Sequence, residues 1–138
     1  MKATNRSDQQ LSEPTKSELE ILQVLWEKGP STVRMINDYL NDQKRAVQYT
    51  STLKIMQLMT EKGMLTRDET QMKHIYHAAV EEQSTKGHLL EKFVETMYNG
   101  SSSNLLMQLL GNQKTSRKEI DEIRAMLDQL EKNNPKND

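Results

Sequence analysis

The hydrophobic pattern of this chain changes its period at Gly63, and that change limits the folds open to it. Before Gly63, apolar residues recur three and four positions apart, as between Leu19 and Trp26, which is the spacing of a helix face. After Gly63, residues 64–80 alternate apolar and polar side chains on either side of a polar turn at 69–71. Alternation around a turn predicts a two-stranded β-hairpin. We therefore expect helices first and a hairpin after them.

Capping residues mark where the helices before the hairpin begin and end. Thr15 and Glu18 have the spacing of a capping box, and a Gly-Pro pair ends the helix that follows them. Ser31 or Thr32 can cap a second helix, because either hydroxyl can accept a hydrogen bond from a free N–H of the first turn.

A third helix is expected from about Tyr49 to Lys62, closed by Gly63. The region of Val47 could add a short third strand to the hairpin. Three helices followed by a hairpin predict a winged helix-turn-helix domain over residues 14–80, whose third helix is placed to enter a DNA groove. The expected fold class is mainly α with a small β-hairpin wing, followed by a C-terminal helical dimerisation module.

Composition argues against one large core, because only 34% of the 138 residues are apolar and the chain has one Trp and one Phe. Residues 81–132 nevertheless carry apolar stripes at helical spacing, and a second capping box, Ser116 with Glu119, begins the last helix. Since no second core is visible to cover these stripes, we expect two chains to clasp through them; folding back onto the winged helix is the alternative. The expected dimerisation residues are Leu89, Phe93, Met97, Leu105, Leu106, Leu109, Leu110, Ile120, Ile123, Leu127 and Leu130. A flexible tail, 1–13, and a frayed C-terminus, 133–138, would flank the two domains.

Charge is unevenly distributed along a chain whose net charge is -1. Residues 43–80 hold six basic and three acidic side chains, a net charge of +3, whereas the segments before and after each sum to -2. A positive excess confined to one segment is what a local anion-binding face requires.

A helical wheel of the third helix separates an apolar side from a polar one. Tyr49, Thr52, Leu53, Met56 and Met59 are expected to face the core. The opposite side carries hydroxyl, amide and cationic groups suited to phosphates and base edges, with Glu61 at its edge; a solvated helix face is the plainer interpretation. The residues expected to contact DNA, including flanking and hairpin cations, are Lys44, Arg45, Gln48, Thr50, Ser51, Lys54, Gln57, Arg67 and Lys73.

Sequence features of an enzyme are missing, and we expect neither a cofactor nor a metal. The chain has no Cys, and His74 and His77 would point to opposite faces of a strand and could not easily share a metal. No nucleophile elbow or Gly-rich phosphate loop occurs. The nine Met, among them Met56 and Met72, are expected to fill the core. Without an apolar leader or a span-length apolar stretch, a cytoplasmic location is expected.

Residues 49–65, "YTSTLKIMQLMTEKGML", resemble the recognition helix of the BlaI/MecI/CopY family of penicillinase-type repressors. Residues 18–33, "ELEILQVLWEKGPSTV", resemble its first helix and the entry to its second. The runs "NGSSSNLLMQLLG" and "SRKEIDEIRAMLDQLE" resemble its dimerisation helices, so the resemblance covers roughly residues 14–132 in order.

This resemblance implies a homodimeric winged-helix repressor that binds a dyad-symmetric operator and often controls its own operon. In the antibiotic-resistance members of the family, a membrane sensor protease triggers cleavage of the repressor in its C-terminal region. By position, Thr50, Ser51 and Lys54 fall on the DNA-reading helix, and Arg67 and Lys73 fall on the wing.

The chain departs from the family pattern at several positions. Leu58 stands where many members have a basic residue, Thr52 replaces a usual Val, and Ala79 stands where a Pro commonly ends the wing. The cleaved members are cut at an Asn-Phe bond where this chain has Gln108-Leu109. The absence of Cys excludes the paired C-x-C copper chemistry of another branch.

Together these features predict a sequence-specific, DNA-binding transcriptional repressor that acts as a homodimer. The alternative is a dimeric winged-helix module whose third-helix face binds another protein, an interpretation favoured by the net charge of -1 and by Leu58.

Overall fold

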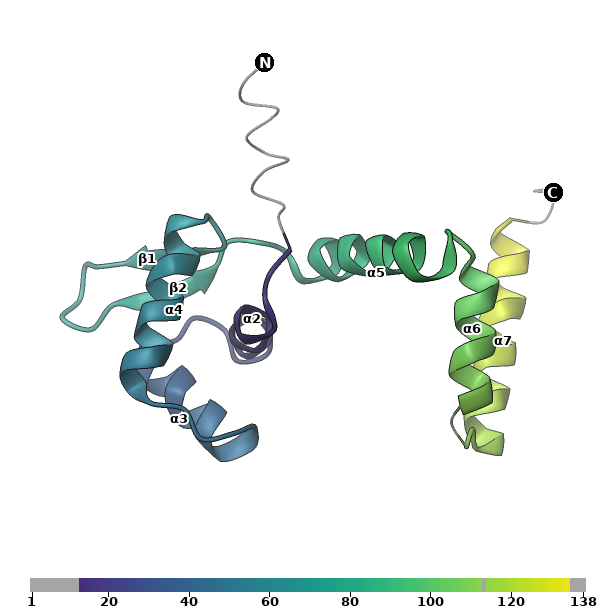
Figure 1. Ribbon diagram of the computed structural model, residues 1–138, viewed down its shortest axis with the longest axis horizontal. Coiled ribbons are helices and arrows are strands. Elements are labelled where there is room, and N and C mark those ends of the chain that lie inside the picture. The colour runs from purple at the N-terminus through teal and green to yellow at the C-terminus, as the bar shows by residue number, and fades with distance from the viewer. Residues whose placement is uncertain (1–12, 113, 135–138) are drawn as a thin grey trace, which may run out of the picture. The chain divides into compact units, whose positions relative to one another are not determined.

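The computed structural model describes residues 13–112 and 114–134 of a mainly helical chain (Figure 1). The chain divides into two compact units, the first ending at Leu90 and the second beginning at Glu91. The flexible tail expected at 1–13 and the frayed C-terminus expected at 133–138 lie almost entirely outside the described residues. Within the first unit, three helices precede a two-stranded antiparallel hairpin, which confirms the predicted winged helix-turn-helix with a β-hairpin wing.

Helices α2 (Lys16–Lys28) and α3 (Val33–Gln43) begin at the capping residues that the sequence suggests. Both bonds of the capping box between Thr15 and Glu18 are formed. Thr32 rather than Ser31 caps α3, its hydroxyl accepting from the Met35 N–H at 3.1 Å. Ser31 has another role, because its backbone exchanges two hydrogen bonds with Tyr76 of the hairpin.

Helix α4 (Tyr49–Glu61) leads directly into the hairpin, whose strands are β1 (Leu65–Asp68) and β2 (Ile75–Ala78). Gly63 has a φ of +87°, a left-handed conformation that is unfavourable for residues with a Cβ and that turns the chain out of the helix. The strands pair antiparallel with Arg67 opposite Tyr76. Beyond them the Ala79 N–H donates to the Met64 carbonyl at 2.8 Å, a bond that a proline at this position cannot make.

The expectation of a third strand near Val47 is wrong. Residues 44–48 have no strand structure, because the backbone groups of Val47 bond to asparagine side chains instead of a neighbouring strand. The third partner of the hairpin is the isolated bridge between Ser31 and Tyr76.

The core of the first unit lies between α2, α3, α4 and the hairpin. Of the residues expected to face inward from α4, Thr52, Met56 and Met59 are buried and Leu53 is partly buried. Tyr49 is a correction, because it is 36% exposed at the first position of the helix. Met72 is another: it is 99% exposed in the hairpin turn and fills no core. The buried apolar side chains are Ile21, Leu22, Val24, Leu25, Val33, Ile36, Leu40, Met56, Met59, Met64, Leu65 and Tyr76.

An ion pair joins the beginning of α2 to the end of α4. Glu18 is only 5% exposed, and its second carboxylate oxygen accepts a 2.7 Å hydrogen bond from the Lys62 ammonium just after α4. Burial alone would raise the pKa of Glu18, but hydrogen bonds from Lys62 and Thr15 and the charge of Lys62 outweigh burial and hold this pKa below its ordinary value. The capping box of α2 thereby also fixes the end of α4.

Two contacts of the Trp26 ring hold the segment that follows the hairpin. The Trp26 ring N–H donates to the Val80 carbonyl at 3.0 Å, and the Lys86 ammonium lies 5.8 Å from the centre of the same ring. The first turns of α5 (Glu82–Tyr98) are therefore attached to the first unit.

Three helices follow the hairpin in the described part of the chain. Asn99 and Gly100 end α5, both with positive φ. Helix α6 spans Ser102–Asn112, and α7 (Arg117–Asn133) begins with the expected capping box at Ser116. None of the described side chains from 82 to 134 is buried.

We expect Glu18→Gln to lower the free energy of unfolding by about 1 kcal/mol near neutral pH, because an amide cannot replace the charge-assisted bond to Lys62. The effect is modest because the Lys62 side chain is 47% exposed and therefore screened. Since the pKa of Glu18 is lower in the folded than in the unfolded state, its stabilisation is full above the unfolded pKa and is lost as pH falls through the folded pKa.

Urea unfolding at about pH 7 and about pH 3, at one fixed protein concentration, measures this effect. The difference between wild type and Glu18→Gln should shrink at the lower pH. Glu82→Gln is the matched control, because it removes an exposed ion pair with Lys86 that contributes little. An equal difference at both pH values would contradict the assigned role of Glu18.

Candidate nucleic-acid interface

The side of α4 that faces away from the core is polar and open to solvent. Gln48 lies at the N-cap position of this helix without a side-chain capping bond, so its amide is not used there. Glu61 is exposed near the other end of the helix, and Leu58, the apolar exception, is 44% exposed. The exposed residues from the predicted DNA-contacting set on α4 are Thr50, Ser51, Lys54 and Gln57.

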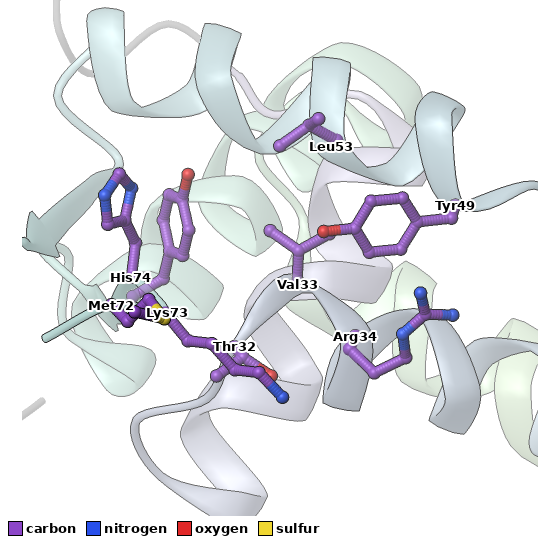
Figure 2. A pocket seen from close by; sticks show the side chains of 9 residues that line it. Thr32, Val33, Arg34, Tyr49, Leu53, Met72, Lys73 and His74 are labelled. Atoms are coloured by element: carbon purple, nitrogen blue, oxygen red, sulfur yellow. The ribbon is translucent and has the colours of Figure 1, made fainter.

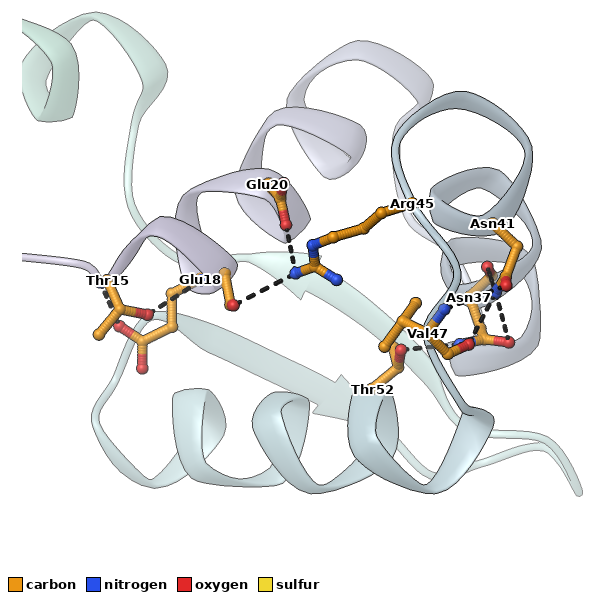
Figure 3. Close-up of polar contacts among 9 residues, drawn as sticks. Thr15, Glu18, Glu20, Asn37, Asn41, Arg45, Val47 and Thr52 are labelled. Atoms are coloured by element: carbon orange, nitrogen blue, oxygen red, sulfur yellow. Dashed lines mark hydrogen bonds and ion pairs between the residues drawn. The ribbon is translucent and has the colours of Figure 1, made fainter.

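Two of the expected phosphate-binding cations already have carboxylate partners. The Arg45 guanidinium donates to Glu20 of α2 at 2.8 Å (Figure 3). It also donates to the Ser17 hydroxyl at 3.3 Å. Arg67 of β1 donates to Glu69 at 2.6 Å, and hydrogen bonds to Tyr76 and Glu69 raise its pKa above its ordinary value. A phosphate would have to compete with these partners for either guanidinium.

The other three expected cations, all lysines, have no such partner among the described residues. Lys44 follows α3, Lys54 lies on α4 and Lys73 lies in the turn of the hairpin, and all three are exposed. None of them forms an ion pair with another described residue. Their charge is therefore not already balanced by a carboxylate of the described residues.

A buried polar network sets the position of α4 on α3. The Asn37 side-chain amide donates to the Thr52 hydroxyl at 2.8 Å and to the Val47 carbonyl at 3.2 Å (Figure 3). The Asn41 side chain donates to the Val47 carbonyl at 2.8 Å and accepts from the Val47 N–H at 3.1 Å. These bonds hold the turn between the two helices, and they include Thr52, where the resembled family usually has Val.

One cation near α4 was not identified from the sequence. Arg34 on α3 lies with its guanidinium carbon 4.5 Å from the centre of the Tyr49 ring. Its proximity to α4 arises from the packing of two helices, and it belongs to an N-terminal segment whose net charge is negative. Two sequence features could have identified Arg34: its position just after the Thr32 cap and its positive charge.

The second unit presents apolar side chains to solvent. Leu110 of α6 and Ile120, Ile123 and Leu127 of α7 line one hollow of about 350 Å³. Among the predicted dimerisation residues, Leu89, Leu105, Ile120 and Ile123 are half-buried, and the others are at least 43% exposed: Phe93, Met97, Leu106, Leu109, Leu110, Leu127 and Leu130.

Each helix in the described part of the chain is too short or too polar to span a membrane.

Residues 14–129 match the family model described as penicillinase repressor. The chain is 25% identical over 120 residues to the methicillin resistance regulatory protein MecI of Staphylococcus aureus (strain Mu50 / ATCC 700699), covering 87% of this chain and 97% of that protein. It is 24% identical to MecI of Mammaliicoccus sciuri over the same shares, and 22% identical to the penicillinase repressor of Staphylococcus aureus, with 87% and 94% covered. These matches confirm the family that residues 49–65 suggest.

We expect Thr52→Val to lower the free energy of unfolding by about 1–3 kcal/mol, because the change keeps the side-chain shape but leaves a buried N–H of Asn37 without an acceptor. Thr52 is 1% and Asn37 is 5% exposed, so water cannot replace the lost hydroxyl. Urea unfolding at fixed protein concentration is the measurement.

The double variant Asn37→Leu with Thr52→Val is the control, since removing both polar partners eliminates the orphaned donor, and the Val47 carbonyl keeps its 2.8 Å bond from Asn41. It should be no less stable than Thr52→Val alone. If Thr52→Val unfolds like wild type, the bond from Asn37 to Thr52 does not stabilise the packing of α4 on α3.

Proposed function

Because this chain belongs to the penicillinase repressor family, we propose that it is a transcriptional repressor that binds a dyad-symmetric DNA operator as a homodimer. The observation that carries the proposal is the exposed polar face of α4, which combines hydroxyl, amide and ammonium groups beside lysines that form no ion pair with the described residues. A helix of this kind on a winged helix-turn-helix can enter a major groove and contact base edges.

In the proposed complex, base contacts come from the exposed polar face of α4. Gln57 and Lys54 offer an amide and an ammonium for base edges, and the hydroxyls of Thr50 and Ser51 lie in the first turn, where free N–H groups also favour phosphate. Lys44 and Lys73 hold backbone phosphates on either side. Arg45 and Arg67 contribute only where a phosphate displaces Glu20 or Glu69.

Dimerisation supplies the second α4. The described side chains of the second unit include no buried residue, so a single copy leaves a wide apolar surface in water. Covering it with the same surface of a second chain is the closed, symmetric solution. Two copies of α4 related by this dyad would enter successive major grooves about 34 Å apart.

A protein-binding role is the second candidate. Leu58 is 44% exposed on α4 among the polar residues, and an apolar side chain there suits a protein partner better than phosphate. A contact of that kind would tolerate salt, whereas DNA binding weakens steeply as salt rises.

The direct test is fluorescence anisotropy of the full-length protein with DNA from just upstream of its own gene, across a salt series, with unrelated DNA as competitor. We expect salt-sensitive binding of two chains per site that survives the competitor. Lys54→Glu should weaken binding at least about tenfold, because each dimer gains two charges that repel the DNA.

Lys28→Glu is the matched control, because Lys28 is an exposed cation at the end of α2, outside α4 and the wing. It should weaken binding less than Lys54→Glu does. Equal losses from the two variants, or no preference over the competitor at any salt concentration, would contradict operator recognition by α4.

A separate prediction concerns the dimer. Leu127→Asp should weaken self-association by at least about a hundredfold, because it places a charge in an apolar contact. Sedimentation velocity over a dilution series measures the association, and the same variant should also bind operator more weakly. Gln129→Asp adds the same charge at an exposed polar position of α7 and should remain dimeric. A Leu127→Asp protein that stays dimeric on dilution would exclude α7 from the interface.

A further inference from the structure

A hollow of about 350 Å³ lies between the beginning of α3, the beginning of α4 and the hairpin turn (Figure 2). Thr32 and Arg34 line it from α3 and its cap, Tyr49 and Leu53 from α4, and Lys73 and His74 from the hairpin. None of its lining residues carries a carboxylate. With about 30 Å³ for each water molecule, it has room for roughly ten waters or for a hydrated anion.

The Arg34 guanidinium is held at this hollow by an aromatic ring. It lies 4.5 Å from the centre of the Tyr49 ring and forms no ion pair with another described residue (Figure 2). A guanidinium fixed on a ring keeps its edge N–H groups free to donate, and its planar fork matches the oxygens of a phosphate.

Lys73 brings a second positive charge to the same hollow from the hairpin. It is exposed and unpaired among the described residues, and it shares the lining with Arg34 although the two lie on different elements. Two cations that line one hollow from different elements, with no carboxylate in its lining, favour the binding of an anion there.

We propose that Arg34 and Lys73 bind one and the same phosphodiester of duplex DNA in this hollow, and that Tyr49 positions Arg34 for that contact. This inference rests on the proposed function and adds residues to it. The ligand is duplex DNA rather than a free anion because the site is continuous with the reading face: Tyr49 directly precedes Thr50 and Ser51 in the first turn of α4. The phosphate in the hollow would fix how deeply α4 enters the groove.

The test compares the salt dependence of duplex binding by the full-length wild type with that of Arg34→Ala, Lys73→Ala and the double variant. Each neutralised phosphate contributes about 0.9 to the slope of log affinity against log salt, and a dimer carries two copies of the site. The double variant should therefore lose about 2 from the slope, and each single variant should weaken binding about three- to tenfold. Separate phosphates for the two cations would give a loss of about 4 and would overturn the shared site.

Lys28→Ala is the control, because Lys28 is also an exposed cation over a tyrosine, 5.4 Å from the centre of the Tyr39 ring, but away from the hollow. A slope change in the double variant no larger than that of Lys28→Ala would overturn the proposal. Tyr49→Leu tests the positioning role: it should weaken binding in the wild-type background but add little to Arg34→Ala, with folding checked by circular dichroism. An equal loss in both backgrounds would remove Tyr49 from the proposal.

Measurement on both the upstream duplex and an unrelated duplex separates this inference from the proposed function. Preference for the upstream duplex with an unchanged slope in the double variant would leave the repressor standing and overturn the shared phosphate site. Equal binding of both duplexes, with a slope that the double variant lowers by about 2, would support the site and contradict operator specificity. A wild type that binds neither duplex would overturn both.

Discussion

The placement of the proposed reading helix depends on one buried hydrogen bond, from the Asn37 amide to the Thr52 hydroxyl at 2.8 Å. Apolar packing alone tolerates small shifts of one helix on another, but a buried donor that loses its acceptor costs about 1–3 kcal/mol. The pair therefore selects one position of α4 on α3. Thr50, Ser51 and Lys54 project from the same helix, so the direction in which they face follows from this contact.

The basic residues of this region fall into two groups, according to whether a carboxylate pairs with them. Arg45 is held by Glu20 and Arg67 by Glu69, so these guanidinium groups shape the surface while part of their charge is already balanced. The lysines at 44, 54 and 73 and Arg34 have no carboxylate partner among the described residues. A chain with a net charge of -1 can in this way present a positive face, because the local field depends on which charges are paired and not on their sum.

The sequence predicts what is decided locally. Thr15 with Glu18, Ser116 with Glu119 and the turn at Gly63 appear where expected, because each involves residues at most a few positions apart. Contacts between distant residues were missed: Lys62 meets Glu18 across 44 positions, and Arg45 meets Glu20 across 25. The wheel placed Tyr49 in the core because it treats every turn alike, whereas Tyr49, at the first position of α4, is 36% exposed and its ring lies against Arg34. Thr52 was recognised as a departure from the family, but its partner, Asn37, lies on another helix.

Under the proposed function, the second unit is as necessary for operator specificity as α4. One α4 offers a short polar face with Leu58 in it, so a single copy can make few base contacts. A second copy on a rigid dyad doubles those contacts and makes the second binding event intramolecular, which strengthens binding without any new contact chemistry. The dyad also doubles every charge at the interface, so that each lysine counts twice in the salt dependence. The exposed apolar side chains of α5, α6 and α7 therefore determine operator affinity as much as the residues that touch DNA, because they decide whether the two reading helices act as one.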